Sequence, residues 1–299
     1  MTEIMRVENL SKVYGPLKAV DDISFAIPEG ICFGLLGPNG AGKTTTIEVM
    51  EGIHAPSSGQ VYFRDKPVDR HFRQKVGIQF QSTALPEFIT VRETLELFSA
   101  FYPNPRPIEE VIRLCSLTDI LKQDNQKLSG GQRQRMLLGL AIIPKPEIIF
   151  LDEPTTGLDP QARRNFWDLI RGIKAEGTTV LLTTHYMEEA ELLCDQVAIM
   201  DHGKLLELDT PAQLLKKHFN GALVTFPLEG QSSDFAALAG FGGLQGMAQR
   251  QGLAELSTNN LDRAVKDLLA AKVNLEGLSI HKPNLEDLFI KLTGSSLRT

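Results

Sequence analysis

Residues 37–44, GPNGAGKT, constrain this chain more than any other segment because they fit the pattern G-x-x-x-x-G-K-[ST]. The apolar run 31–36 before them predicts a strand, and residues 45–50 after them predict the first turns of a helix. In a glycine-rich loop between a strand and a helix, several backbone N–H groups converge on one point, where the helix dipole also attracts an anion. The segment therefore predicts a loop that binds phosphate groups.

Two side chains of this loop carry further chemistry. Lys43 is long enough to reach the outer phosphates of a nucleotide, and the hydroxyl of Thr44 can ligate Mg²⁺. The alternative is a glycine-rich turn that binds nothing, but the flanking strand and helix favour the phosphate-binding loop. The residues predicted to contact the nucleotide here are Gly37, Pro38, Asn39, Gly40, Ala41, Gly42, Lys43, Thr44 and Thr45.

Composition limits the class of protein. The 299 residues are 42% hydrophobic and 23% charged, which is typical of a globular chain with one large domain or two smaller ones. The net charge is −6 and no stretch is strongly basic, so nucleic acid is not expected as a partner. The three cysteines lie in apolar segments and are expected to be buried and reduced. The longest nearly apolar stretch, 136–143, is far shorter than the ~20 residues that a membrane-spanning helix needs.

The order of predicted elements indicates an α/β fold with a parallel sheet at its core. Residues 1–30 predict antiparallel β structure, and residues 88–145 predict a helical subdomain. Strands that alternate with helices predict right-handed crossovers, with the last strand of this region at 196–200. The pattern then changes, so we predict one domain over 1–218 and a small α+β domain over 219–299.

Two carboxylates, Asp152 and Glu153, directly follow the buried strand predicted at 147–151. In a parallel α/β sheet, the carboxyl end of this strand lies at the same edge as the phosphate-binding loop. Asp152 can hold Mg²⁺ through its water shell, and Glu153 can orient and deprotonate an attacking water. The alternative is a solvated acidic strand end before Pro154, but the upstream loop favours a catalytic pair.

A second anion-attracting helix N-terminus is predicted at Ser129, Gly130, Gly131 and Gln132. Ser129 and Gln132 have the spacing of a capping box. One triphosphate needs only one phosphate-binding loop, so this second site leads to the hypothesis that two copies of the chain share each nucleotide. The alternative is an ordinary glycine-flanked helix cap.

Together these motifs resemble those of the nucleotide-binding subunits of ATP-binding cassette (ABC) transporters, over residues 3–218. The resemblance implies a P-loop NTPase fold, ATP and Mg²⁺ as ligands, and ATP hydrolysis at the interface of a head-to-tail dimer. The motifs follow the order of the family, with residues 37–44 as the phosphate-binding loop, 128–132 as the signature, 148–153 as the acidic strand, 157–159 as the D-loop and His185 as the switch histidine.

The resemblance also implies roles for residues outside the loop. Tyr14 resembles the aromatic residue that stacks on adenine, and Asp159 would act across the dimer interface as well as cap a helix. Gln81 resembles the Q-loop glutamine, preferred over Gln79 because of its spacing from the preceding strand. His185 would contact the γ-phosphate. The implied catalytic residues are Lys43, Gln81, Glu153 and His185, and the implied Mg²⁺ ligands are Thr44, Gln81 and Asp152.

Two features indicate the type of ABC protein: a single cassette without a predicted membrane span, and the pattern of residues 282–294. With one cassette and no predicted span, the chain is expected at the cytoplasmic face of the cell membrane, as a homodimer bound to separately encoded permease subunits. Residues 282–294 resemble the ending of bacterial drug-, antibiotic-, polysaccharide- or sodium-exporter ATPases, which favours export of drugs or hydrophobic small molecules. The alternative is a soluble ABC ATPase that acts on ribosomes, DNA or another protein. A kinase or GTPase outside the ABC family should lack residues 128–132 and His185.

The assignment of Glu153 as the base is testable by Glu153→Gln. Because the amide keeps the size of the side chain but cannot accept a proton, the variant should bind ATP, lose nearly all turnover and accumulate as an ATP-bound dimer. Phosphate release and size-exclusion chromatography with ATP measure the two effects. Normal turnover by this variant would contradict the assignment.

Overall fold

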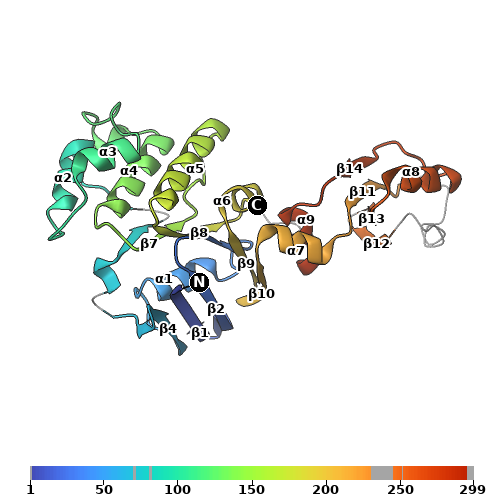
Figure 1. The fold of residues 1–299 in the computed structure, drawn as a ribbon, viewed down its shortest axis with the longest axis horizontal. Helices are drawn as coiled ribbons and strands as arrows, with labels where there is room; N and C mark the ends of the chain where they lie inside the picture. The colour runs from blue at the N-terminus through green and yellow to red at the C-terminus, as the bar shows by residue number, and fades with distance from the viewer. Residues whose placement is uncertain (1, 70–71, 81–82, 230–244, 251, 295–299) are drawn as a thin grey trace. The chain divides into compact units, whose positions relative to one another are not determined.

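A computed structural model describes residues 2–69, 72–80, 83–229, 245–250 and 252–294 (Figure 1). The chain divides into two compact units, one ending at Pro211 and the other spanning Ala212–Gly294. The division falls at the start of helix α7 (Pro211–His218), whereas the sequence put the boundary after this segment. The difference arises because the pattern of residues did not predict this helix.

A six-stranded sheet, mostly parallel, forms the centre of the first unit. All residues of β3, β7 and β8 are buried, which explains why these segments are largely apolar in the sequence, apart from the threonines of β8 and the final aspartate of β7. The predicted parallel core is confirmed, and the loops after β3 and β7 leave the same edge of the sheet. In sheet order the strands are β10 (Lys204–Asp209), β9 (Gln196–Asp201), β3 (Cys32–Leu36), β8 (Thr179–Thr184), β7 (Ile148–Asp152) and β6 (Val76–Gln79).

Strand β10 corrects the prediction that residues 196–200 form the last strand of this region. It pairs antiparallel with β9 at the edge of the sheet. Its residues are only partly buried, so it lacks the apolar run that revealed the central strands. His202 and Gly203 connect the two strands with positive φ angles of 46° and 76°, as in a tight hairpin turn. This His-Gly turn was the sequence signal from which β10 could have been predicted.

An antiparallel sheet packs on one side of the central sheet, as predicted for the N-terminal segment (Figure 1). Side chains from both sheets and from helix α1 (Lys43–Met50) form one buried core, which includes Ile4, Leu10 and Ile27 of the antiparallel sheet and Phe33 and Phe150 of the central sheet. This core fixes α1, and with it the loop that precedes α1, against the central sheet. The strands of the antiparallel sheet are β2 (Leu17–Pro28), β1 (Glu3–Tyr14), β4 (Ser58–Phe63) and β5 (Lys66–Pro67), in that order.

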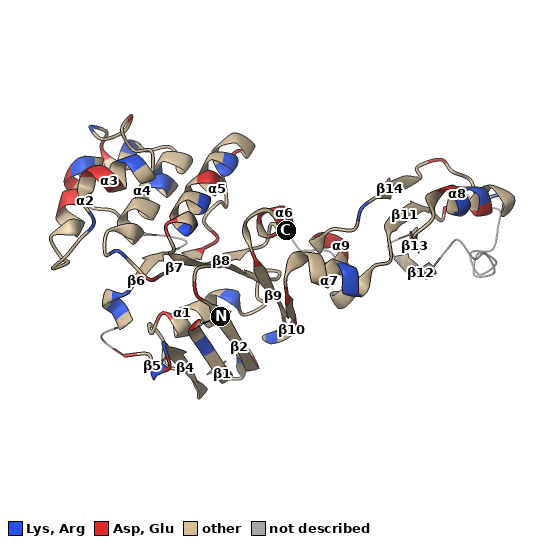
Figure 2. Cartoon of the chain, in the orientation of Figure 1, with Lys and Arg blue, Asp and Glu red and all other residues tan. Residues whose placement is uncertain are grey.

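Helices cover the other side of the central sheet. The predicted capping box of Ser129 and Gln132 forms, and a second one, from Thr90 and Glu93, begins α2. Acidic and basic residues are mixed along these helices (Figure 2), and Arg106 contacts Glu110 at 2.5 Å and Glu176 at 2.8 Å. The helices are α2 (Val91–Ser99), α3 (Ile108–Leu114), α4 (Gly130–Ile142), α5 (Pro160–Ala175) and α6 (Met187–Leu193), with a short 3₁₀ helix at Asn125–Lys127. A second 3₁₀ helix, Phe72–Gln74, precedes β6 and contributes Phe72 to the core between the two sheets.

The second unit has the predicted combination of an antiparallel sheet and helices. Val224, Phe226 and Leu256 of the sheet pack on Ala264 and Leu268 of helix α8 (Leu261–Ala270). The remaining elements are β12 (Gln245–Arg250), β13 (Leu253–Thr258), β11 (Ala222–Pro227) and β14 (Ser279–His281), in sheet order, and α9 (Leu285–Thr293).

A close approach of β6 to α4 requires glycine at position 77. A Cβ atom there would lie 2.0 Å from the carbonyl oxygen of Ala141, whereas a Cβ at Gly172 in helix α5 would meet nothing within 4 Å. We expect Gly77→Ala to lower the free energy of unfolding by about 1–3 kcal/mol, and Gly172→Ala to leave it unchanged or raise it by up to about 1 kcal/mol. Chemical denaturation measures both, and equal stability of the two variants would contradict this packing.

Candidate functional site

The loop between β3 and α1 has a backbone that depends on glycine. Gly37, Gly40 and Gly42 have φ angles of 156°, 82° and 99°. A Cβ atom would lie 2.3 Å from the carbonyl oxygen of Met200 at position 37, and 2.3 Å from that of Ala19 at position 42. Side chains are therefore excluded on both steric and conformational grounds, and the curled backbone has the form that the motif predicts.

Lys43 is the first residue of α1, and its side chain is only 5% exposed. Its Nζ donates to the carbonyl oxygens of Gly37 at 3.0 Å and Pro38 at 3.1 Å, and lies 3.5 Å from Oε1 of Glu153. Burial lowers the pKa of the Lys43 ammonium, and the nearby Glu153 carboxylate opposes this change. The loop and the acidic strand end are thus joined by an ion pair that is largely shielded from water.

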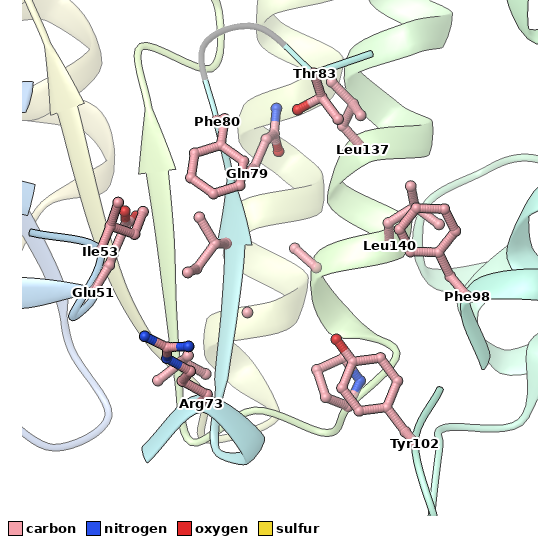
Figure 3. A pocket seen from close by; sticks show the side chains of 15 residues that line it. Glu51, Ile53, Arg73, Gln79, Phe80, Thr83, Phe98, Tyr102, Leu137 and Leu140 are labelled. Carbon is pink, nitrogen blue, oxygen red and sulfur yellow. The ribbon is translucent and has the colours of Figure 1, made fainter. Parts of the chain in front are cut away.

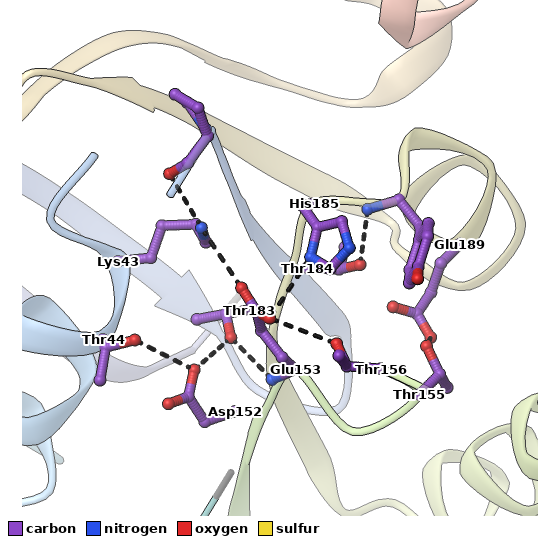
Figure 4. A network of polar contacts seen from close by, with 12 residues as sticks. Lys43, Thr44, Asp152, Glu153, Thr155, Thr156, Thr183, Thr184, His185 and Glu189 are labelled. Carbon is purple, nitrogen blue, oxygen red and sulfur yellow. Dashed lines mark hydrogen bonds and ion pairs between the residues drawn. The ribbon is translucent and has the colours of Figure 1, made fainter. Parts of the chain in front are cut away.

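Asp152 ends strand β7 and is 7% exposed. Its Oδ1 accepts a hydrogen bond from Thr183 Oγ1 at 2.5 Å and lies 3.5 Å from Thr44 Oγ1 (Figure 4). Burial raises the pKa of the Asp152 carboxyl, and the bond from Thr183 acts against that rise.

The donor set around Asp152 fits Mg²⁺. In the described part of the chain, no cluster of three or more His, Cys, Asp or Glu side chains could hold a metal. Mg²⁺ typically uses one or two protein oxygens and completes its shell with phosphates and water. Thr44 and Asp152, facing each other beside the phosphate-binding loop, match that requirement.

Glu153 has a positive φ of 46°, a conformation that costs a non-glycine residue about 1–3 kcal/mol. Its N–H donates to Thr183 Oγ1 at 2.9 Å, and its Oε2 accepts from Thr156 Oγ1 at 3.2 Å. His185 Nδ1 lies 3.3 Å from the same Oε2, although the ring makes no hydrogen bond there. The structure therefore brings Lys43, Glu153 and His185 together, and the meeting of Lys43 with Glu153 was predicted from the ends of their strands.

The sequence analysis missed Thr183, which is fully buried at the end of β8. Its single hydroxyl donates to the carboxylate of Asp152 and accepts from the N–H of Glu153, so it fixes the two acidic residues relative to each other (Figure 4). The sequence signal for this residue was the polar pair Thr183–Thr184, which ends a largely apolar strand directly before His185.

Glu189 was also missed. This fully buried side chain of α6 accepts hydrogen bonds from Thr155 Oγ1 at 2.9 Å and from Trp167 Nε1 at 2.8 Å. Burial raises the pKa of its carboxyl, and the bonds that it accepts oppose the rise. Glu189 thereby ties the turn after Glu153 to the helix that follows His185 (Figure 4).

The cavity at the phosphate-binding loop has a volume of about 860 Å³, and a different cavity beside β6 has about 540 Å³ (Figure 3). Tyr14 does not line it in the described part of the chain; that ring is 42% exposed and contacts Lys12 and His54. The predicted site residues that do line this cavity are Asn39, Gly40, Gly42, Lys43, Thr44, Thr45, Glu153 and His185.

The signature segment lies in a different cavity of the same chain. Ser129 is the N-cap of α4, and Gly130 is the first residue of that helix. Ser129, Gly131 and Gln132 line a separate cavity of about 500 Å³, together with Arg135. The structure therefore does not bring the signature to the phosphate-binding loop within one copy.

Asp159 and the glutamines near β6 complete the predicted set. Asp159 is the N-cap of α5, as predicted, and accepts from two backbone N–H groups at 2.9 Å each. Gln81 lies outside the described residues. Gln79, the alternative, is buried in β6, where its amide donates to Gln134 of α4.

Comparison with known proteins identifies the family. Residues 20–156 match the family described as ABC transporter. Over 97% of its length, the chain is 36% identical to the Nod factor export ATP-binding protein I of Burkholderia orbicola (strain AU 1054), of which 97% is covered. The chain belongs to the ATP-binding proteins of ABC transporters. It is 33% identical to the linearmycin resistance ATP-binding protein LnrL of Bacillus subtilis (strain 168), with 99% of this chain and 100% of that protein covered.

The fold of this ABC protein matches solved cassettes. The dimeric structure of MJ0796, a bacterial ABC transporter cassette, aligns with a TM-score of 0.63 at 25% identity and covers 69% of this chain and 98% of its own. ABC ATP-binding proteins are ATPases, so this chain is an ATP-binding ATPase. Within the described residues, no helix is both long and apolar enough to cross a membrane.

Thr183→Val tests the link between the two carboxylates. Valine keeps the shape of the side chain but removes the donor to Asp152 and the acceptor for the Glu153 N–H. A lost buried hydrogen bond typically costs about 1–3 kcal/mol, so we expect the ATPase rate to fall at least roughly tenfold and more Mg²⁺ to be required for half-maximal rate. Thr183→Ser, which keeps the hydroxyl, should retain most of the activity. Equal rates for the two variants would contradict the role of the hydroxyl.

Proposed function

We propose that this ABC protein is the ATP-hydrolysing subunit of an exporter, working as a head-to-tail homodimer on separately encoded permease subunits. The observation that carries the proposal is the separation of the phosphate-binding loop and the signature into two cavities of one copy. A nucleotide on the loop of one copy would meet the signature only if a second copy supplied it. The dimeric form of the similar cassette supports this arrangement.

The phosphates would be bound by the backbone of residues 37–42 and by the ammonium of Lys43. In the described structure, the carboxylate of Glu153 partly neutralises the ammonium of Lys43. When a nucleotide binds, the negative charge of its phosphates would take over this role. Thr44 and Asp152, with Gln81, would hold Mg²⁺, which would neutralise charge on the phosphate oxygens. Thr45 would add a backbone N–H from the first turn of α1.

Glu153 would act as the general base. Its strained backbone and the contacts of its carboxylate with Lys43, Thr156 and His185 hold it at the mouth of the cavity, where an attacking water would approach the γ-phosphate. His185 would contact the γ-phosphate, since its Nδ1 makes no hydrogen bond within the described residues. The buried Glu189 would hold the segments that carry Glu153 and His185 in fixed positions relative to each other.

The second copy would contribute Ser129, Gly130, Gly131 and Gln132, whose helix N-terminus attracts the far side of the γ-phosphate. Asp159 would act across the same interface while capping α5. Tyr14 would stack on adenine, although its exposed ring is not among the described residues that line the cavity. Hydrolysis would remove the γ-phosphate that joins the two copies, so the dimer would open.

Export is proposed because two relatives that the chain covers almost completely are named for Nod factor export and for linearmycin resistance. The dimer would act at the cytoplasmic face of the cell membrane, with the permease docked near residues 83–90 and the helical subdomain. The second unit would be an accessory domain of this subunit.

Purification of the chain from membranes of its own cells tests this proposal. We expect a protein with several membrane-spanning helices to copurify in near-stoichiometric amount, and the ATPase rate to change when both are reconstituted in vesicles. Recovery with ribosomes or another soluble complex, and with no membrane-spanning protein, would overturn the transport assignment in favour of a soluble ABC ATPase.

A further inference from the structure

The aromatic ring of Tyr186 contacts two other side chains beside the phosphate-binding loop. Tyr186 directly follows His185, is the N-cap residue of α6, and lines the same cavity of about 860 Å³. The centroids of the His185 and Tyr186 rings are 4.1 Å apart, and the ring planes are inclined by 42°. The guanidinium carbon of Arg163, in α5, lies 4.0 Å from the centroid of the Tyr186 ring. We call these three side chains the Arg-Tyr-His cluster.

The Arg-Tyr-His cluster is closely packed. A cation is attracted to an aromatic ring when it lies within about 6 Å of the ring centroid, and aromatic rings usually pack with centroids about 4.5–7 Å apart. Both distances in the cluster are shorter than these typical values. Other cation–ring contacts of the described residues are longer, for example 4.6 Å at Arg6 and 6.0 Å at Arg64. The Tyr186 ring is therefore held by direct contact with both of its neighbours.

The imidazole of His185 depends on this contact for its orientation. Its Nδ1 is buried without a hydrogen-bond partner among the described residues, although it lies 3.3 Å from Oε2 of Glu153 (Figure 4). A hydrogen bond to one ring nitrogen commonly fixes a functional histidine, and Nδ1 of His185 has none. The contact with the Tyr186 ring therefore restricts the rotation of the imidazole.

Arg163 interacts with two groups near His185. Its Nε is buried without a hydrogen-bond partner in the described part of the chain, so its guanidinium is not fixed by a bond at this atom. Burial raises the pKa of the Glu189 carboxyl, and the positive charge of Arg163 is one of the influences that oppose the rise. Arg163 can therefore affect His185 by two routes, through the Tyr186 ring or through Glu189.

We propose that Tyr186 is a positioning residue for His185, and that Arg163 supports this role by fixing the Tyr186 ring. The inference rests on the proposed function, because it concerns how His185 is held toward the γ-phosphate. The Tyr186 ring limits the orientations of the imidazole, so His185 is already in place when the nucleotide binds. The guanidinium over the Tyr186 ring in turn limits the rotation of that ring.

Replacement of the aromatic ring tests the role of Tyr186 in the full chain. Because correct placement of His185 matters most in the transition state, Tyr186→Leu should lower kcat for ATP hydrolysis roughly tenfold and change KM by less than about twofold. Tyr186→Phe keeps the ring and its contacts and should retain most of the activity. A merely structural role would not produce this selective loss of kcat. Equal kcat values for Tyr186→Leu and Tyr186→Phe would overturn the inference.

Arg163→Met tests the cation, with Arg164→Met as the matched control. Arg164 is the next residue of α5, is exposed, and its replacement removes the same charge. Arg163→Met should lower kcat roughly three- to fivefold, whereas Arg164→Met should hydrolyse ATP like the wild type. Added to Tyr186→Leu, Arg163→Met should lower kcat little further, because the ring through which it acts is already absent. Full multiplication of the two losses would overturn the role of Arg163 at the ring and favour the route through Glu189.

His185→Ala separates this inference from the proposed function. We expect this variant to lose nearly all turnover, and normal turnover would refute the proposed contact of His185 with the γ-phosphate. An inactive His185→Ala together with a fully active Tyr186→Leu would refute only the positioning role. Chemical denaturation shows whether each variant folds. If Tyr186→Leu does not fold, equal kcat values for Arg163→Met and Arg164→Met would overturn the inference, and a selective loss in Arg163→Met would support it.

Discussion

In the central sheet, strands β3, β8 and β7 run parallel and side by side, so the segments that follow them leave the same edge. This constraint brings together Lys43, His185 and Glu153, which are far apart in the sequence. The core between the two sheets holds α1 and its loop against that edge. The positions of Lys43, Glu153 and His185 therefore depend on the parallel pairing of three fully buried strands.

Several ionisable groups are buried at this edge of the sheet, and neighbouring charges and hydrogen bonds offset the free-energy cost of burying them. Lys43 is paired with Glu153, Asp152 accepts a short bond from Thr183, and Glu189 accepts two bonds from neighbouring helices and turns. Each contact offsets part of the cost of removing a charge from water. Glu51, which is 3% exposed, has an Oε2 without a hydrogen-bond partner within the described residues, and the second carboxylate oxygen of Glu189 also lacks one there.

The sequence predicted those parts of the site that a local pattern specifies. The glycines of the phosphate-binding loop, the capping box at Ser129 and the cap at Asp159 each follow from residues within a few positions of one another. Glu153 was predicted to lie beside the phosphate-binding loop because it directly follows a buried strand.

The remaining features depend on contacts between distant segments. Thr183 is an ordinary strand residue until β7 and β8 pair, and Glu189 resembles any helical glutamate until Trp167 packs beside it. Strand β10 lies at a sheet edge, where partial exposure removes the apolar pattern.

The central claim is that one copy holds only half of each ATP site, and mixing two inactive variants tests it most directly. Lys43→Ala disables the phosphate-binding loop and leaves the signature intact, whereas Ser129→Arg disables the signature alone. Each variant by itself should be inactive. An equimolar mixture should regain roughly a quarter of wild-type ATPase activity, because half of random dimers are mixed and each of those has one intact site. A mixture as inactive as its components would contradict the shared site.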